Sequence, residues 1–226
     1  MRIRRNQDFA VITGDIVGFS KLSRAQRSHL VPVLRRASRE LQIHFKDSVP
    51  LGVDVFRGDS WQLVVSKPAR AVRIALFIRA YCVSQMKVRS VDTRLAIGIG
   101  SIDYLPSRAA SSGDGEAFRR SGQALDKMAR ARRMSIDGPP SIGSLGLRTV
   151  DVLLRLLDAL ARAWTQRQAN AVCGALLGWK QERIASSWFK GTLSQQAVAQ
   201  HLDRAGWNAV AAALKHLEEG WGASPP

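Results

Sequence analysis

The chain has 226 residues, a hydrophobic content of 46% and a formal net charge of +16. This apolar fraction is typical of globular proteins, and the length allows one large domain or a medium domain with a small one. No apolar run approaches the roughly 20 residues of a membrane span, and Asp15 interrupts the first one, which argues against a secretory signal. We therefore expect a cytoplasmic protein with no membrane partner.

Most of the positive charge belongs to the first part of the chain. Residues 1–140 hold 25 Lys and Arg against 12 Asp and Glu, a net +13, whereas residues 141–226 hold 9 against 6, a net +3. Such an excess favours polyanionic partners such as nucleotides and nucleic acid. The two cysteines, Cys82 and Cys173, each stand alone in an apolar stretch and are expected to be buried thiols.

Hydrophobic periodicity predicts strands and helices in alternation over the first part. A buried strand over 9–16 precedes a helix over 23–45, whose apolar residues share one face and whose interior contains Pro32. Two short apolar runs, 52–56 and 61–65, flank the letters RGDS and predict a hairpin. The elements that follow are a helix over 68–85, a strand over 93–99, a loop over 111–115 and a helix over 116–133.

This order begins with the six elements of a ferredoxin-like βαββαβ arrangement, so we expect an α+β domain over residues 1–135. In that topology the first and third strands are central neighbours, which places the end of the first strand beside the hairpin turn. Asp15 and Asp59 then lie near each other. A single aspartate at a strand end is typical of a turn, but two at one sheet edge are typical of a divalent-metal site for phosphoryl transfer.

The second part of the chain is predicted to be helical. Residues 136–148 are rich in Gly, Pro and Ser and predict a linker, and residues 149–226 form a small all-α domain. Within it, a helix over 181–187, a turn and a second helix that begins at Ser194 have the periodicity of a helix-turn-helix. The second helix would offer to a DNA groove the side chains of Ser194, Gln195, Gln196, Gln200 and Arg204. Because this part carries only +3, the alternative is a helical bundle that mediates dimerisation or contacts a partner.

Four segments of the first 135 residues resemble the catalytic domain of class III nucleotide cyclases, and more closely the bacterial SatD-like group. They are DIVGFS (15–20), FRGDS (56–60), RLAIGIG (94–100) and SGQALDKMAR (121–130). The resemblance implies a palm-type fold and two Mg²⁺ or Mn²⁺ ions held by Asp15, the Ile16 carbonyl and Asp59. It also implies nucleotide contacts from the first segment, at Gly18, Phe19 and Ser20.

The resemblance further implies which groups act on the nucleotide. Asp126 and Arg130 match the helical Asn and Arg that steady the ribose and the transition-state phosphates, and in a homodimer they would face the aspartates of the partner chain. Val55 and Arg119 stand where the family reads a purine through Lys and Asp. The implied substrate is a nucleoside triphosphate with non-standard base recognition, pyrimidine nucleotides included. The C-terminal part resembles the helix-turn-helix tails of some SatD-like proteins.

The sequence leads first to a metal-dependent cyclase that converts a nucleoside triphosphate to a cyclic monophosphate and pyrophosphate, joined to a module for double-stranded DNA. The alternative is a non-catalytic, nucleotide-sensing transcriptional regulator on a degenerate cyclase scaffold. A third hypothesis is an interaction protein in which both parts have lost their chemistry.

Overall fold

The computed structural model describes residues 7–86, 91–107, 109–188, 191 and 193–222. Its main sheet has the strand order β2-β3-β1-β4-β5. The strands are β1 (Phe9–Ile16), β2 (Asp54–Phe56), β3 (Ser60–Val65), β4 (Thr93–Gly100) and β5 (Met134–Asp137). Neighbouring strands are antiparallel except β4 and β5, which are parallel. The predicted adjacency of the first and third strands is confirmed.

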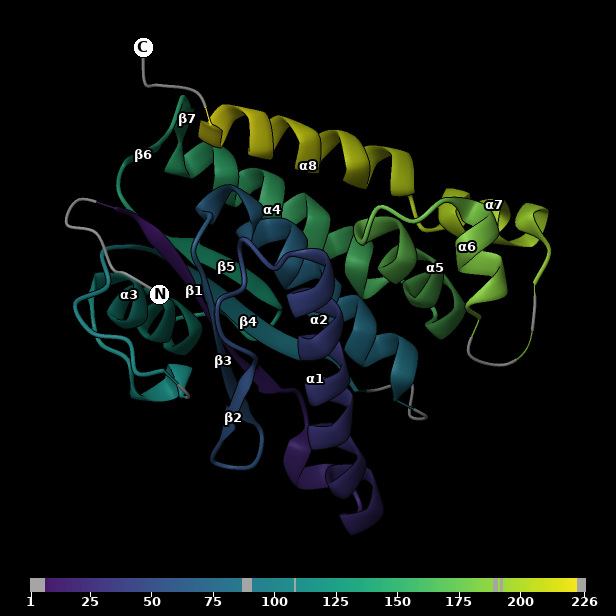
Figure 1. The fold of residues 1–226 in the computed structure, drawn as a ribbon, viewed down its shortest axis with the longest axis horizontal. Coiled ribbons are helices and arrows are strands. Elements are labelled where there is room, and N and C mark those ends of the chain that lie inside the picture. The colour runs from purple at the N-terminus through teal and green to yellow at the C-terminus, as the bar shows by residue number, and fades with distance from the viewer. Residues whose placement is uncertain (1–6, 87–90, 108, 189–190, 192, 223–226) are drawn as a thin grey trace.

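Helices cover both faces of this sheet. The helices α1 (Arg24–His44) and α2 (Ala71–Gln85) lie on one face, in front of the strands in Figure 1. The helix α3 (Glu116–Asp126) packs on the other. The alternation of side chains along β1 produces the two layers, because Ile12 joins the core beneath α1 and α2 while Val11 packs with Phe118 of α3.

The helix α3 approaches the sheet closely at a glycine. A Cβ added to Gly98 of β4 would lie 2.2 Å from the carbonyl oxygen of Ala117 and 2.4 Å from the backbone nitrogen of Ser121. The Ser121 hydroxyl also lies 2.8 Å from the Thr13 hydroxyl of β1, in a buried hydrogen bond. The atoms facing Gly98 belong to the helix backbone, so only a displacement of α3 could make room for a side chain.

Gly98→Ala is therefore expected to lower the free energy of unfolding by about 1–3 kcal/mol, the usual cost of overpacking. Urea denaturation followed by circular dichroism measures the change. The matched control is Gly122→Ala in α3, where nothing lies within 4 Å of the added Cβ. That variant is expected to gain up to about 1 kcal/mol from helix propensity. Equal stability of the two variants would contradict the close contact.

The structure differs from the sequence prediction at two places within residues 116–148. The helix predicted to reach residue 133 ends at Asp126, before a run rich in arginines whose like charges would repel within a helix. The predicted linker contains the end of β5 and a hairpin of β6 (Ser141–Ile142) and β7 (Leu145–Gly146). Burial of Met134 and Ile136 beside β4 stabilises β5 despite the nearby glycine and prolines.

Among the residues described after the sheet are five helices: α4 (Leu147–Arg162), α5 (Gln166–Leu176), α6 (Gln181–Ser186), α7 (Gln195–Arg204) and α8 (Trp207–Gly222). The helical character predicted for this part is confirmed. Its buried side chains belong to the same hydrophobic core as those of α1 and α2, and α4 and α5 lie beside α2 in Figure 1. The division into units 1–135 and 149–226 stays a prediction, but one continuous core joins them.

A buried ion network reinforces this junction. Arg79 of α2 is fully buried, and its guanidinium donates to the Asp158 carboxylate of α4 at 2.7 Å. It also donates to both oxygens of Asp92, at 2.9 and 2.8 Å, just before β4. The second oxygen of Asp158 accepts a hydrogen bond from the Arg133 backbone nitrogen at 2.9 Å. The network therefore links α2, α4 and the segments that enter β4 and β5.

The predicted burial of both cysteines is confirmed, and burial raises the pKa of the Cys82 thiol to about 12.

None of the helices in the described part of the chain has the length and hydropathy needed to span a lipid bilayer.

Candidate functional site

Asp15 and Asp59 lie at the same edge of the sheet. Asp15 is the penultimate residue of β1, and Asp59 closes the turn that leads into β3. The antiparallel register pairs Gly14 with Trp61, so the next step along each strand brings Asp15 opposite Ser60. A Cβ on Gly58 would lie 3.7 Å from the Phe19 ring, so the hairpin turn also adjoins the segment after β1. The DIVGFS and FRGDS segments are thus side by side.

The backbone at Asp15 is fixed by buried hydrogen bonds. The indole N–H of Trp61 donates to the Thr93 hydroxyl at 3.0 Å, and this hydroxyl donates to the Asp15 carbonyl oxygen at 2.7 Å. Gly14 leaves space for the indole, because a Cβ there would lie 2.4 Å from the Trp61 ring. Trp61 and Thr93 are fully buried, so the core itself sets the position of Asp15.

The carboxylate of Asp15 is bound by Arg94, whose role no sequence motif indicated. The two residues are register partners on β1 and β4, which places their side chains on the same face of the sheet. The Arg94 guanidinium donates to both carboxylate oxygens, with Nε 3.1 Å from Oδ1. This hydrogen bonding to Asp15 raises the pKa of Arg94, opposed by burial and assisted by the negative charges of Asp15 and Asp126. The result is a bidentate ion pair.

The charge of Asp126 acts on this pair, whereas Arg130 lies beyond the end of α3. The charge of Asp126, the last residue of α3, contributes to the raised pKa of Arg94 in its own chain. Because α3 ends at Asp126, Arg130 is not one helical turn further on, and its side chain is exposed. The prediction that both residues lie on one helix is therefore wrong, while their roles toward a nucleotide stay a prediction.

The residues at this edge do not fit a pair of divalent ions in the arrangement that the structure shows. Both oxygens of Asp15 accept hydrogen bonds from Arg94, whose charge already neutralises the carboxylate. Among the described residues, no group of three or more His, Cys, Asp or Glu could hold a metal ion. Of the two carboxylates implied by the sequence, beside the Ile16 carbonyl, Asp59 forms no ion pair with a described residue, whereas Asp15 is paired with Arg94. Sites for Mg²⁺ and Mn²⁺ need several free oxygen ligands.

The other residues predicted to contact a nucleotide lie in the turn after β1, on β2 and on α3. Gly18 has a φ of +68° and begins a short 3₁₀ turn in which Ser20 is exposed. The Phe19 ring lies 5.1 Å from the Arg27 guanidinium carbon. Val55 of β2 packs against the core, and Arg119 donates to the exposed carboxylate of Asp114 at 2.9 Å. Val55 and Arg119 are thus engaged in packing and in a surface ion pair.

A hollow of about 340 Å³ borders the segment that resembles the ribose- and phosphate-binding helix. Its lining includes Lys127 and Arg132, with Asp137 as the acidic residue among the described lining groups. Arg132 donates to Asp151 at 2.7 Å, whereas Lys127 is exposed at the end of α3. The Lys127 ammonium group could therefore bind an anionic group in this hollow.

The side chains predicted to contact DNA lie on α7 and at its start. Those of Gln195, Gln196, Gln200 and Arg204 are exposed. The Ser194 hydroxyl accepts a hydrogen bond from the Ala197 backbone nitrogen at 3.1 Å, so it caps the helix. Positive charge gathers nearby, since the pKa of His201 is lowered by burial and then by Arg167 and Arg204. The buried Ala185 accepts a backbone hydrogen bond from Leu193, and so joins α6 to the segment before α7.

Comparison with known proteins gives partial similarities in structure. No protein-family model and no curated protein matches the chain. The crystal structure of the guanylyl cyclase Cya2 is similar over 60% of this chain and 77% of that one, at 14% identity and a TM-score of 0.44. The catalytic core of a rhodopsin-guanylyl cyclase with converted specificity, in complex with ATPαS, covers 57% and 77%, with the same identity and TM-score. The active GGEEF domain of a diguanylate cyclase from Vibrio cholerae covers 57% and 83%, at 20% identity and a TM-score of 0.39.

Proposed function

We propose that this protein is a nucleotide-binding regulator on a ferredoxin-like, cyclase-type scaffold, in which α6 and α7 act as a DNA-binding helix-turn-helix. The observation that carries the proposal is the ion pair of Asp15 and Arg94. The guanidinium gives the strand-end carboxylate the positive charge that a divalent ion would otherwise bring. The loops of a nucleotide site are then retained without the metal pair that turnover requires.

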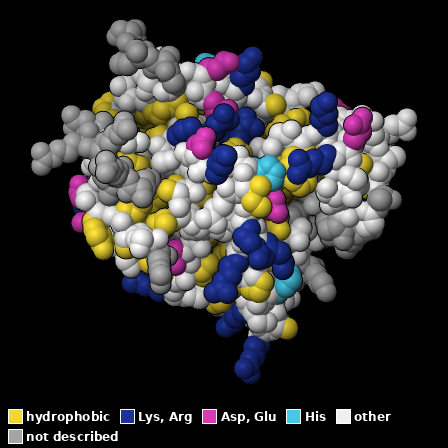
Figure 2. Space-filling model, viewed as in Figure 1, with side chains coloured by type: hydrophobic (Ala, Val, Ile, Leu, Met, Phe, Trp, Pro, Cys, Tyr) yellow, Lys and Arg dark blue, Asp and Glu magenta, His cyan; other side chains and the backbone are white. Residues whose placement is uncertain are grey.

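The surface charge supports a phosphate-bearing partner. Figure 2 shows Lys and Arg side chains gathered along α1, where Arg24, Arg35 and Arg39 are exposed. These three form no ion pair within the described part of the chain. Arg35 and Arg39 are one helical turn apart, so their like charges destabilise the isolated helix slightly. Uncompensated charge of this kind favours polyanions, and the hollow beside Lys127 supports a nucleotide as one of them.

A metal-dependent cyclase remains the second candidate. The adjacency of the DIVGFS and FRGDS loops favours it, as does the partial exposure of the ion pair, 22% for Asp15 and 30% for Arg94. Exposed pairs are weak enough for an incoming cation to compete with the guanidinium. In this alternative a homodimer binds a nucleoside triphosphate and releases a cyclic monophosphate and pyrophosphate.

Incubation with each of the four nucleoside triphosphates and Mn²⁺, with chromatography of the products, separates the two candidates. We expect no cyclic product, together with a rise in Tm in the presence of the nucleotide that binds. A cyclic monophosphate that disappears in Asp59→Ala, but not in the exposed control Asp203→Ala on α7, would establish the cyclase instead. Absence of both product and Tm shift would contradict nucleotide binding.

Gln196→Ala and Arg204→Ala test the DNA-binding role of α7. With a duplex selected from a random pool, each is expected to weaken binding by about 1–3 kcal/mol if the side chain contacts a base. Fluorescence anisotropy over a range of salt concentrations measures the loss and the salt slope. Asn208→Ala, exposed on α8, is the control. Unchanged binding by both variants at every salt concentration would exclude α7 as the recognition helix.

A further inference from the structure

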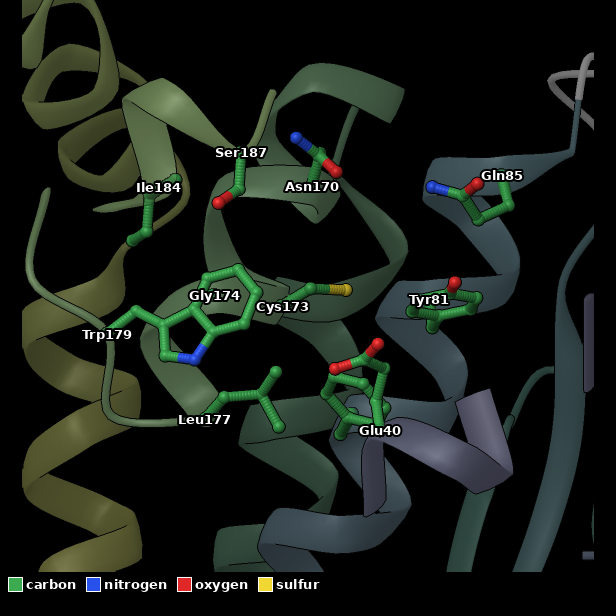
Figure 3. Close-up of a pocket in the computed structure, with 11 residues that line it drawn as sticks. Glu40, Tyr81, Gln85, Asn170, Cys173, Gly174, Leu177, Trp179, Ile184 and Ser187 are labelled. Atoms are coloured by element: carbon green, nitrogen blue, oxygen red, sulfur yellow. The ribbon is translucent and has the colours of Figure 1, made fainter. Parts of the chain in front are cut away.

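A second cavity lies between the sheet-covering helices and the C-terminal helices, apart from the edge that carries Asp15. It has a volume of about 210 Å³ and is bordered by α1, α2, α5 and α6. Figure 3 shows the Glu40 carboxylate and the Tyr81 hydroxyl at one side and the Trp179 indole at the other. Apolar walls come from Phe77, Leu177 and Ile184.

Glu40 is the charged residue among the described lining residues, and its histidine neighbour does not neutralise it. His44 Nδ1 lies 3.7 Å from the Glu40 carboxylate but 3.0 Å from the Glu40 backbone carbonyl oxygen. The Trp179 indole N–H donates to His44 Nε2 at 3.0 Å, so Nε2 carries no hydrogen. The hydrogen is then on Nδ1, which donates it to the backbone carbonyl. The imidazole is neutral in this arrangement.

Two guanidinium groups act on residues that line the cavity. Arg183 lies over the Trp179 ring, with its guanidinium carbon 4.3 Å from the ring centroid. The positive charge of Arg36 acts on the Tyr81 hydroxyl. Burial raises the pKa of Tyr81 against the influence of Arg36, so this hydroxyl is neutral. Within the described residues the Glu40 carboxylate accepts no hydrogen bond, and its side chain, 36% exposed, lines the cavity.

We propose that this cavity binds a small organic amine with an apolar body. The ammonium group would donate to the Glu40 carboxylate, and the apolar body would replace water against Phe77, Leu177 and Ile184. A cavity of roughly 150 Å³ holds one benzene molecule. The larger volume here has room for a ring with a short amine chain, while the charge of Glu40 excludes a carboxylate in the same place. Because α6 packs against α7, the bound amine would contact the helix pair assigned to DNA.

Calorimetric titration of the full chain with phenethylamine, phenethyl alcohol and phenylacetate tests the proposal. We expect the amine to bind about ten-fold or more tightly than the alcohol, because its hydrogen bond to Glu40 is charge-assisted, and we expect no binding of the acid. Glu40→Gln should reduce the affinity for the amine to that for the alcohol and leave the alcohol unchanged. Glu182→Gln, exposed on α6, is the matched control and should change neither.

Leu177→Trp fills the cavity and should abolish binding of both compounds. If that variant does not fold by circular dichroism, Ile184→Phe on α6 serves the same purpose. Equal affinity of the amine for wild type and Glu40→Gln would overturn the assignment. Absence of amine binding at about 10 mM, a concentration that detects even millimolar affinities, would overturn it as well. Neither result would affect the nucleotide assay at the sheet edge.

Discussion

Replacing Asp158 with alanine is expected to lower the free energy of unfolding by about 3–5 kcal/mol, the cost of breaking a buried ion pair from one side. Asp158 is 3% exposed, and Arg79 is fully buried. The substitution leaves Arg79 Nη1 and the Arg133 backbone N–H without acceptors, while the guanidinium keeps its charge. Asp92 still accepts hydrogen bonds from Arg79 Nε and Nη2, so it continues to compensate part of the guanidinium charge.

Chemical denaturation followed by fluorescence and by circular dichroism measures this loss. Asp203→Ala, an exposed aspartate of another helix, is the control and should change stability by less than about 0.5 kcal/mol. Adding Arg79→Met to Asp158→Ala should recover part of the loss, because no unpaired charge then remains in the core. Because the network joins α2 to α4, both probes should report one transition. A loss equal to that of the control would show that the network adds nothing to the junction.

Local patterns predicted the elements of the first part because each has its own signal. The helix α1 begins one residue after Ser23, whose hydroxyl accepts from Gln26 in a capping box, and it tolerates Pro32. The strand β5 has no such signal. It is stable because Ile136 pairs with Ile97 across a parallel register, a contact that the composition of residues 135–144 conceals.

The candidate site, like the fold, was predicted from the sequence only in part. The positions of Asp15 and Asp59 follow from strand order, because a βαββαβ topology joins their two loops. The partner of Asp15 does not follow from it. Arg94 faces the carboxylate only because of the register between β1 and β4, which hydrophobic periodicity leaves open by one or two residues. The cavity near Glu40 was also missed, because its lining residues are spread along the chain from Glu40 to Ser187.

Removal of the Arg94 guanidinium is the sharpest test of what this edge can do. Arg94→Ala is expected to raise the affinity for Mn²⁺ about ten-fold or more, because Asp15 loses the cation that occupies both of its oxygens. The charges of Asp59 and Asp126 then add to a site without a compensating arginine. The stability cost should be about 1 kcal/mol or less, since the pair is partly exposed and Asp15 is held by its backbone.

Electron paramagnetic resonance of free Mn²⁺ during titration measures this affinity. In the double variant Arg94→Ala/Asp15→Asn the gain should disappear, and Arg119→Ala, which removes a surface ion pair, should leave the affinity at the wild-type value. Tight Mn²⁺ binding by the wild type would show that Arg94 is no obstacle, and the non-catalytic proposal would lose its main support. Weak binding by both wild type and Arg94→Ala would mean that Asp15 and Asp59 cannot share an ion. The two-metal alternative would then fail even with the arginine removed, because the geometry of the loops, rather than one displaceable charge, would exclude the metal.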